Sequence, residues 1–241
     1  MSSWRAAWET WSTYSLADLL MFSPRTYYRL FELYNAAIWP GHLAAAAMGI
    51  AILACALRRR AASARIAAGL LAACWLWVAW AFLFKRYAPV NWAADYFAYG
   101  FGAEALLLLW LGTVRGRLVF PPLRNLMARA AFGIAVFGLF VYPLLAAISG
   151  RPWQQLEMFG LAPDPTAVAT LGLLSFASRA PALLLPVPLL WCAISGATLF
   201  TMDAPDAWVA PAATLLALLL AAWKPAASQS AQDMSLPHSY S

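Results

Sequence analysis

Two polar side chains stand at the start of the first long apolar run, in the stretch LYNAAIWPGH at 33–42. Asn35 and His42 are seven residues apart, so a continuous helix would place both on one face. An amide and an imidazole can each donate and accept hydrogen bonds, which suits recognition of a polar group on a solute. The more common role of such a histidine is a buried imidazole whose bonds are satisfied within the protein. Both interpretations fit the sequence.

Glu104 is the only acid that the sequence places deep within an apolar run, near the middle of 96–114. An ionised side chain at the centre of a bilayer costs several kcal/mol unless it is paired, hydrated or protonated. Glu104 is therefore a candidate solute or proton site. The alternative is a protonated carboxyl group that holds two helices together through a hydrogen bond.

Two connecting segments add further polar and aromatic residues. Asn91 and Asp95 lie in KRYAPVNWAADY at 85–96, and the segment YPLLAAISGRPWQQLEMFGLAPDPT at 142–166 is long for this chain. Loops of this length often carry function. We predict that both segments and the first helix wall an outward-facing polar pocket, with these solute-binding candidates: Asn35, His42, Asn91, Asp95 and Glu104.

Signatures of catalysis and of metal binding are missing from the sequence. It has no GxSxG, no HExxH and no glycine-rich phosphate loop. His42 and His238 are too few for a histidine-rich metal or haem centre, and Cys55, Cys74 and Cys192 lie in apolar runs without a CxxC pair. We therefore expect no catalytic residue, no metal ligand and no cofactor, and a function other than that of an enzyme.

The composition indicates a protein of the lipid bilayer. Hydrophobic residues make up 63% of the 241 residues and charged residues only 11%, with a mean hydropathy of +0.68. A soluble domain of this size could not bury so much apolar surface. The net charge of +6 comes from short basic clusters between apolar runs. This pattern is typical of cytoplasmic loops and argues against a nucleic-acid partner.

The predicted fold class is all-α: a polytopic helical membrane bundle of about seven transmembrane helices, preceded by an N-terminal amphipathic interfacial helix. A spanning helix needs about 20 mostly apolar residues. The fifth run is short, so it either crosses a thinned bilayer or re-enters, and we favour crossing, with Asp164 as N-cap and Pro165 as the first helical residue. The candidate spans are 36–57, 66–84, 96–114, 130–149, 165–178, 182–201 and 207–223.

Three regions divide the chain: an interfacial segment at 1–33, a transmembrane domain at 34–223 and a disordered cytoplasmic tail at 224–241. In the first region, tryptophans recur at helical spacing, Ser23 and Pro24 indicate a helix start, and an apolar stripe opposes a charged one. The tryptophans are Trp4, Trp8 and Trp11, and the stripe is Tyr27, Phe31, Tyr34 and Ile38.

Trp39 and Pro40 separate this helix from the first span. Pro40 cannot donate to the carbonyl of Ala36, and its ring clashes there, so the chain can bend at this point. We interpret the pair as a hinge and interfacial anchor. The alternative is a discontinuous helix that shapes a binding site.

With seven crossings, ten of the sixteen basic residues fall on one side. Short loops rich in Lys and Arg stay in the cytoplasm. We therefore predict a bacterial cytoplasmic (inner) membrane protein with its N-terminus in the periplasm and its C-terminus in the cytoplasm. The ten residues are Arg58, Arg59, Arg60, Arg65, Arg115, Arg117, Arg124, Arg129, Arg179 and Lys224.

The chain resembles the domain of unknown function 6064 family, a family of uncharacterised bacterial multi-pass membrane proteins. The resemblance covers about 25–223 and rests on LYNAAIWP at 33–40, YPLL at 142–145 and FGLAPDPTAVATLGLL at 159–174, with NWAADYFAYGF at 91–101 as a weaker match. It implies a helical inner-membrane protein without an assigned activity. The family pattern has a cysteine where this chain has Asp164.

Two functions lead the hypotheses, and a membrane-embedded enzyme comes third because only loop residues could serve it. The first is the binding or transport of a small solute through the outward-facing polar pocket. The alternative is a non-catalytic accessory or assembly protein for a membrane partner complex. The expected partners are thus the lipid bilayer and either a small solute or a membrane protein.

Overall fold

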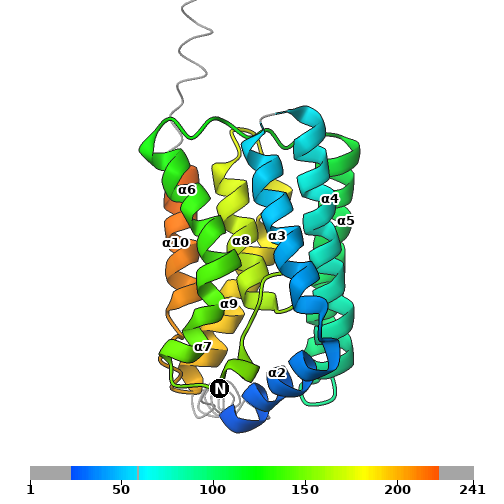
Figure 1. The fold of residues 1–241 in the computed structure, drawn as a ribbon, viewed down its shortest axis with the longest axis vertical. Helices are drawn as coiled ribbons and strands as arrows, with labels where there is room; N and C mark the ends of the chain where they lie inside the picture. The colour runs from blue at the N-terminus through cyan, green and yellow to red at the C-terminus, as the bar shows by residue number, and fades with distance from the viewer. Residues whose placement is uncertain (1–22, 59, 223–241) are drawn as a thin grey trace, which may run out of the picture.

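The computed structural model describes residues 23–58 and 60–222, and these form a bundle of helices (Figure 1). The all-helical class is confirmed for them, since their only β-type pairing is an isolated bridge between Val119 and Arg179. Residues 1–22, 59 and 223–241 lie outside the described residues, and with them Trp4, Trp8, Trp11 and the predicted tail.

Four helical segments are long and apolar enough to cross a membrane, and a fifth is added if the bent pair α2 and α3 counts as one span. The predicted seven spans are therefore not confirmed. The four are α4 with the π-helical η2 (Ala61–Trp77, Val78–Tyr87), α5 with η3 (Ala94–Leu107, Leu108–Val114), α6 with η4, η5 and α7 (Leu126–Val136, Phe137–Val141, Tyr142–Leu144, Leu145–Ile148), and η7 with α9 (Ala182–Leu184, Pro186–Thr201).

Two further apolar runs form shorter helices, α8 (Pro163–Phe176) and α10 (Val209–Ala222), each of 14 residues. At 1.5 Å per residue such a helix is about 21 Å long, whereas the hydrocarbon core of a bilayer is about 30 Å thick. The predicted fifth span at 165–178 is thus a helix, but one too short to cross a bilayer of ordinary thickness.

α8 is the central helix of the bundle, packed against α6, α9 and α10 (Figure 1). Every one of its residues is buried. Two glycines allow α6 and its continuation η4 to approach it closely. A Cβ atom added to Gly172 would lie 2.3 Å from the backbone nitrogen of Ala135, and one added to Gly138 would lie 2.7 Å from that of Ala169. Because glycine has no Cβ atom, the backbones of α6 and η4 can contact the backbone of α8 at these two positions.

α2 (Pro24–Ile38) lies across one end of the bundle (Figure 1). Ser23 caps it by accepting a hydrogen bond from the backbone N–H of Thr26 at 3.2 Å. The apolar stripe of α2 packs on the protein: the Phe31 ring stacks on Phe82 at 4.7 Å, and Trp77 donates to the hydroxyl of Tyr34 at 2.8 Å. That α2 also lies at a membrane surface stays a prediction.

The chain turns by 92° between α2 and α3 (Gly41–Leu57), with Trp39 and Pro40 at the turn. The two helices are therefore not continuous. The prediction that Asn35 and His42 share one face of a continuous helix does not hold.

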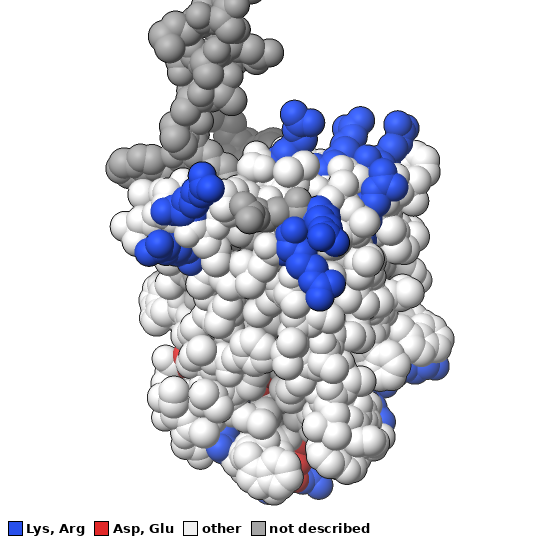
Figure 2. Space-filling view, turned by 45° about the horizontal axis from the view of Figure 1, so that its top comes forward, with Lys and Arg blue, Asp and Glu red and all other residues white. Residues whose placement is uncertain are grey.

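Basic side chains gather at the opposite end of the bundle from α2 (Figure 2). They flank three connections there, between α3 and α4, between η3 and α6, and between α8 and η7. The described members of this group are Arg58, Arg60, Arg65, Arg115, Arg117, Arg124, Arg129 and Arg179.

Candidate functional site

A cavity of about 790 Å³ opens at the α2 end of the bundle. We call it the end cavity. Its walls are one face of α2, the first turn of α3 and the segment 153–158, which begins with the short helix η6 (Trp153–Gln155). Most of the lining is apolar, in contrast to the polar pocket predicted from the sequence. The lining residues are Arg29, Glu32, Leu33, Asn35, Ala36, Trp39, His42, Trp153, Gln154, Leu156 and Met158.

Asn35 and His42 form a polar pair in the end cavity. The Asn35 amide donates to the carbonyls of Gln154 and Leu156, both at 2.9 Å, so its oxygen is left to accept. That oxygen lies 3.2 Å from Nε2 of His42, which must therefore carry the proton. In the neutral imidazole Nδ1 is then an acceptor, and it has no partner among the described residues. The turn at Pro40, rather than a continuous helix, allows this contact.

The other three solute-binding candidates lie elsewhere. The Asn91 side chain accepts from the backbone N–H of Ala93 at 3.0 Å, and Asp95 is in the first turn of α5. Glu104 is fully buried on α5, and neither carboxyl oxygen has a partner among the described residues. None of the three lines the end cavity. The structure thus brings together only two of the five candidates, and a role in solute binding stays a prediction for all of them.

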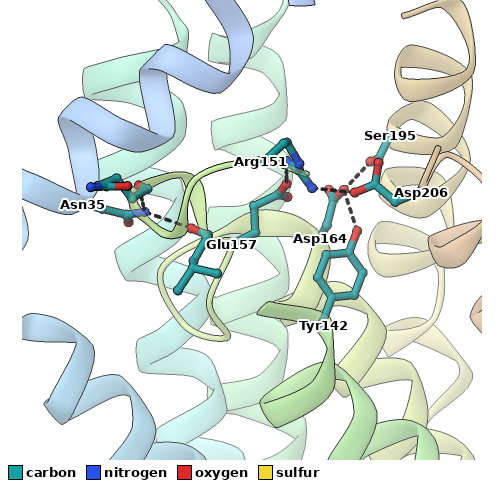
Figure 3. A network of polar contacts seen from close by, with 9 residues as sticks. Asn35, Tyr142, Arg151, Glu157, Asp164, Ser195 and Asp206 are labelled. Carbon is teal, nitrogen blue, oxygen red and sulfur yellow. Dashed lines mark hydrogen bonds and ion pairs between the residues drawn. The ribbon is translucent and has the colours of Figure 1, made fainter. Parts of the chain in front are cut away.

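A buried ionic cluster lies beside the end cavity, and sequence reasoning missed it (Figure 3). Arg151 donates from one terminal nitrogen to Glu157 at 3.1 Å and from the other to Asp206, in the α9–α10 connection, at 2.5 Å. Its guanidinium also lies over the Tyr28 ring, 4.3 Å from the centroid. The three ionic side chains are at most 10% exposed. We call these residues the Arg151 cluster.

Asp164 extends this group of buried acids (Figure 3). Its carboxylate accepts hydrogen bonds from Tyr142 at 3.1 Å, Trp191 at 2.7 Å and Ser195 at 2.5 Å. The prediction that Asp164 is an N-cap is wrong, because α8 begins at Pro163 with Ala162 as its cap. Three side-chain donors from two other elements hold the carboxylate instead.

Glu104, the acid that the sequence places deep within an apolar run, is not the only buried acid among the described residues. Asp164 is fully buried, while Glu157 and Asp206 are 3% and 5% exposed. Acids in connecting segments are expected to face solvent. Their spacing along the chain does not show which of them meet in space. The one available signal was Arg151, the single basic residue in the long loop 149–162, six residues from Glu157.

Burial and charge act in opposite directions on the Arg151 cluster. Burial raises the pKa of Glu157, and the charge of Asp164 raises it further, while Arg151 opposes both. Burial alone lowers the pKa of Arg151, but the charges of Glu157 and Asp206 raise it above its ordinary value. Arg151 therefore stays charged, and Glu157 holds its proton to a higher pH than an exposed glutamate.

Hydrogen bonding in the Arg151 cluster is incomplete within the described part of the chain. Nε of Arg151, Oε2 of Glu157 and Oδ1 of Asp206 are buried and have no partner there. A buried carboxylate oxygen without a donor destabilises the ionised form. The cluster is thus suited to hold a proton rather than a full set of charges.

Comparison with known proteins places the chain in a family. The family model described as "Family of unknown function (DUF6064)" matches residues 25–232. No curated protein and no solved structure matches the chain. The match covers most of the chain, including α2 to α10, the end cavity and the Arg151 cluster. The protein therefore belongs to the DUF6064 family of unknown function.

Proposed function

We propose that this protein is a multi-pass membrane protein that binds a small amphipathic molecule in the end cavity. The observation that supports this most directly is the lining, which is apolar along Leu33, Ala36 and Met158 and polar at Asn35 and His42. Ligand sites commonly combine an apolar wall with a few fixed polar groups. The apolar part of a ligand would lie along the wall, with its polar group near the Asn35–His42 pair.

Binding accounts for the geometry better than transport through the bundle does. The end cavity lies at one end, and beyond it α8 is buried along its whole length. Aromatic rings fill the neighbouring interior. The ring centroids of Trp75 and Phe101 are 4.3 Å apart, and those of Phe101 and Trp191 are 5.1 Å apart. Passage of a solute would require these packed elements to separate.

The charge distribution supports an orientation for the proposed membrane protein. Basic residues concentrate at the end opposite α2 (Figure 2), and loops rich in Lys and Arg remain in the cytoplasm. In this orientation the end cavity faces the periplasmic side of a bacterial inner membrane. Trp39 and Trp153, which are 66% and 71% exposed at its rim, would then lie at headgroup depth.

Competable photo-crosslinking tests the proposed site. The full chain in lipid nanodiscs is incubated with a single-chain fatty alcohol that carries a diazirine, then irradiated, and labelled peptides are mapped by mass spectrometry. We expect labelling of the peptide containing 153–158 that excess unlabelled alcohol removes. Ala36→Trp fills the end cavity and should abolish this labelling, whereas Ala37→Trp, exposed but outside the cavity lining, should not. Labelling that survives Ala36→Trp would refute the site.

An accessory role is the second candidate. An apolar groove of about 510 Å³ runs between α6 and α10, and an added Cβ at Gly133 in its lining would meet nothing within 4 Å. Small residues let a neighbouring helix approach closely in a membrane. Gly133→Leu should then release a co-purifying membrane partner while leaving the crosslinking unchanged.

A further inference from the structure

We propose that the Arg151 cluster is a proton-binding site, in which the charge of Glu157 sets the position of the 153–158 wall of the end cavity. An effect of this proton on solute affinity rests on the proposed function, whereas the proton-binding site itself does not.

The charge count of the buried acids requires a proton. Glu157, Asp206 and Asp164 would contribute three negative charges in the ionised state, and Arg151 is the only cation that pairs with any of them among the described residues. Burial raises the pKa of Asp164, but its three side-chain donors oppose this effect, and Asp206 accepts from the guanidinium at 2.5 Å. Glu157 has only the 3.1 Å contact with Arg151, and its second oxygen is unpartnered. The proton therefore resides on Glu157.

A neutral Glu157 is compatible with the observed geometry. The C=O oxygen of its side-chain carboxyl group can still accept from Arg151 at 3.1 Å. The cluster then contains one ion pair, between Arg151 and Asp206. Loss of the proton to solvent adds a negative charge next to the other two carboxylates in a buried place. Arg151, in the same loop, faces Glu157, and so do groups from four other elements. These groups are Tyr27 and Tyr28 on α2, Tyr142 on η5, Asp164 on α8 and Asp206 in the α9–α10 connection.

The backbone couples this charge to the end cavity. Leu156 has φ of −60° and ψ of 141°, so the backbone leaves η6 in a non-helical conformation, and adjacent side chains face different surroundings. Leu156 and Met158 accordingly line the end cavity, while Glu157 between them is buried in the Arg151 cluster. The same segment is held to α2 by Asn35, which donates to the Leu156 carbonyl (Figure 3). Movement of an ionised Glu157 toward solvent would therefore displace the wall.

Infrared titration in nanodiscs tests the proton directly. A protonated carboxylic acid has a C=O stretching band that the carboxylate lacks. We expect a band component that disappears as pH rises through neutrality, that is absent in Glu157→Gln and that is kept in the matched control Glu32→Gln at the cavity rim and in Glu104→Gln, whose buried carboxyl group contributes a band of its own. A set of titrating bands that Glu157→Gln leaves wholly unchanged would overturn the assignment.

Cysteine labelling tests the movement without any ligand. Leu156→Cys is reacted with a water-soluble maleimide, and rates are corrected for thiol ionisation and for labelling of the protein without the added cysteine. We expect a several-fold rise with pH, lost when Glu157→Gln is added and kept with Glu32→Gln. If Glu157→Gln does not fold, Asp206→Asn replaces it and should move the midpoint of the rise to lower pH, because one neighbouring negative charge is gone. A pH profile that neither variant alters would refute the coupling.

These outcomes are separable from those of the proposed function. Absence of competable crosslinking, together with a titrating band and wall movement that depend on Glu157, would remove the ligand and keep the proton site. Crosslinking without either effect would do the reverse.

Discussion

Replacement of Arg151 by methionine tests whether the Arg151 cluster holds the long loop in place. Methionine keeps much of the length of the side chain but removes the charge from between Glu157 and Asp206. These carboxylates are 4% and 5% exposed, and Arg151 is 10% exposed, so solvent cannot compensate for the loss. Removal of one partner from a buried ion pair costs about 3–5 kcal/mol. For a chain of this size, each kcal/mol lowers the melting temperature by about 2–4 °C, so we expect a decrease of about 6–20 °C.

The same substitution at an exposed ion pair provides the control. Arg29 pairs with Glu32 on α2, but its side chain is 57% exposed. Such pairs contribute about 0.2–1 kcal/mol, so Arg29→Met should lower the melting temperature by only a few degrees. Both variants are measured by thermal unfolding in the same mild detergent.

Two additional measurements separate charge from packing. If the penalty comes from uncompensated negative charge, it shrinks as the pH falls and Glu157 takes up its proton. It is also largely recovered when Glu157→Gln and Asp206→Asn are added to Arg151→Met, because a buried polar network without net charge no longer requires a cation. A loss below about 1 kcal/mol, or a loss of equal size at all pH values, would show that the cluster does not stabilise the loop as argued.

Two other outcomes follow from the same geometry. Gly172→Ala should destabilise the chain by about 1–3 kcal/mol or more in detergent melts, since the new methyl group meets the α6 backbone, whereas Gly100→Ala, with nothing within 4 Å, should have little effect. The raised pKa of Glu157 means that the folded chain keeps a proton above pH 4.5 that the unfolded chain has lost, so stability should fall as pH rises through the folded pKa. Melts over this range should show the slope in the wild type and a weaker one in Glu157→Gln; a wild-type stability that rises with pH would contradict the sign.

The sequence predicts the helices well because apolar runs and their breaks are local signals. Ser23 and Pro24 indicate the start of α2, and Pro40 indicates the turn that follows it. Which helices are enclosed by the others is not a local property. The run that forms α8 is apolar enough to suggest a span, yet its burial depends on how α6, α9 and α10 surround it.

The candidate site was predictable only in part for the same reason. Asn35 and His42 are close in the sequence and could be grouped on that ground, although the turn at Pro40, and not the helical spacing, brings them into contact. The Arg151 cluster joins residues up to 55 positions apart, from Arg151 to Asp206, and no spacing rule relates them. Asp164 is further hidden, because an acid next to two prolines resembles a helix cap when its distant donors Trp191 and Ser195 are not known.

The complete enclosure of α8 has a consequence for biogenesis. A helix emerging from the ribosome partitions into lipid only if its own surface is sufficiently apolar, and α8 carries Asp164, Thr166, Thr170 and Ser175. Its hydroxyl and carboxyl groups find their hydrogen bonds in the protein, with Ser175 bonded to the carbonyl of Ala217 on α10 and Asp164 bonded to α9. Both of these elements are synthesised after α8. In the proposed membrane protein, stable insertion of this segment would therefore wait until the last two helices of the described chain have been made.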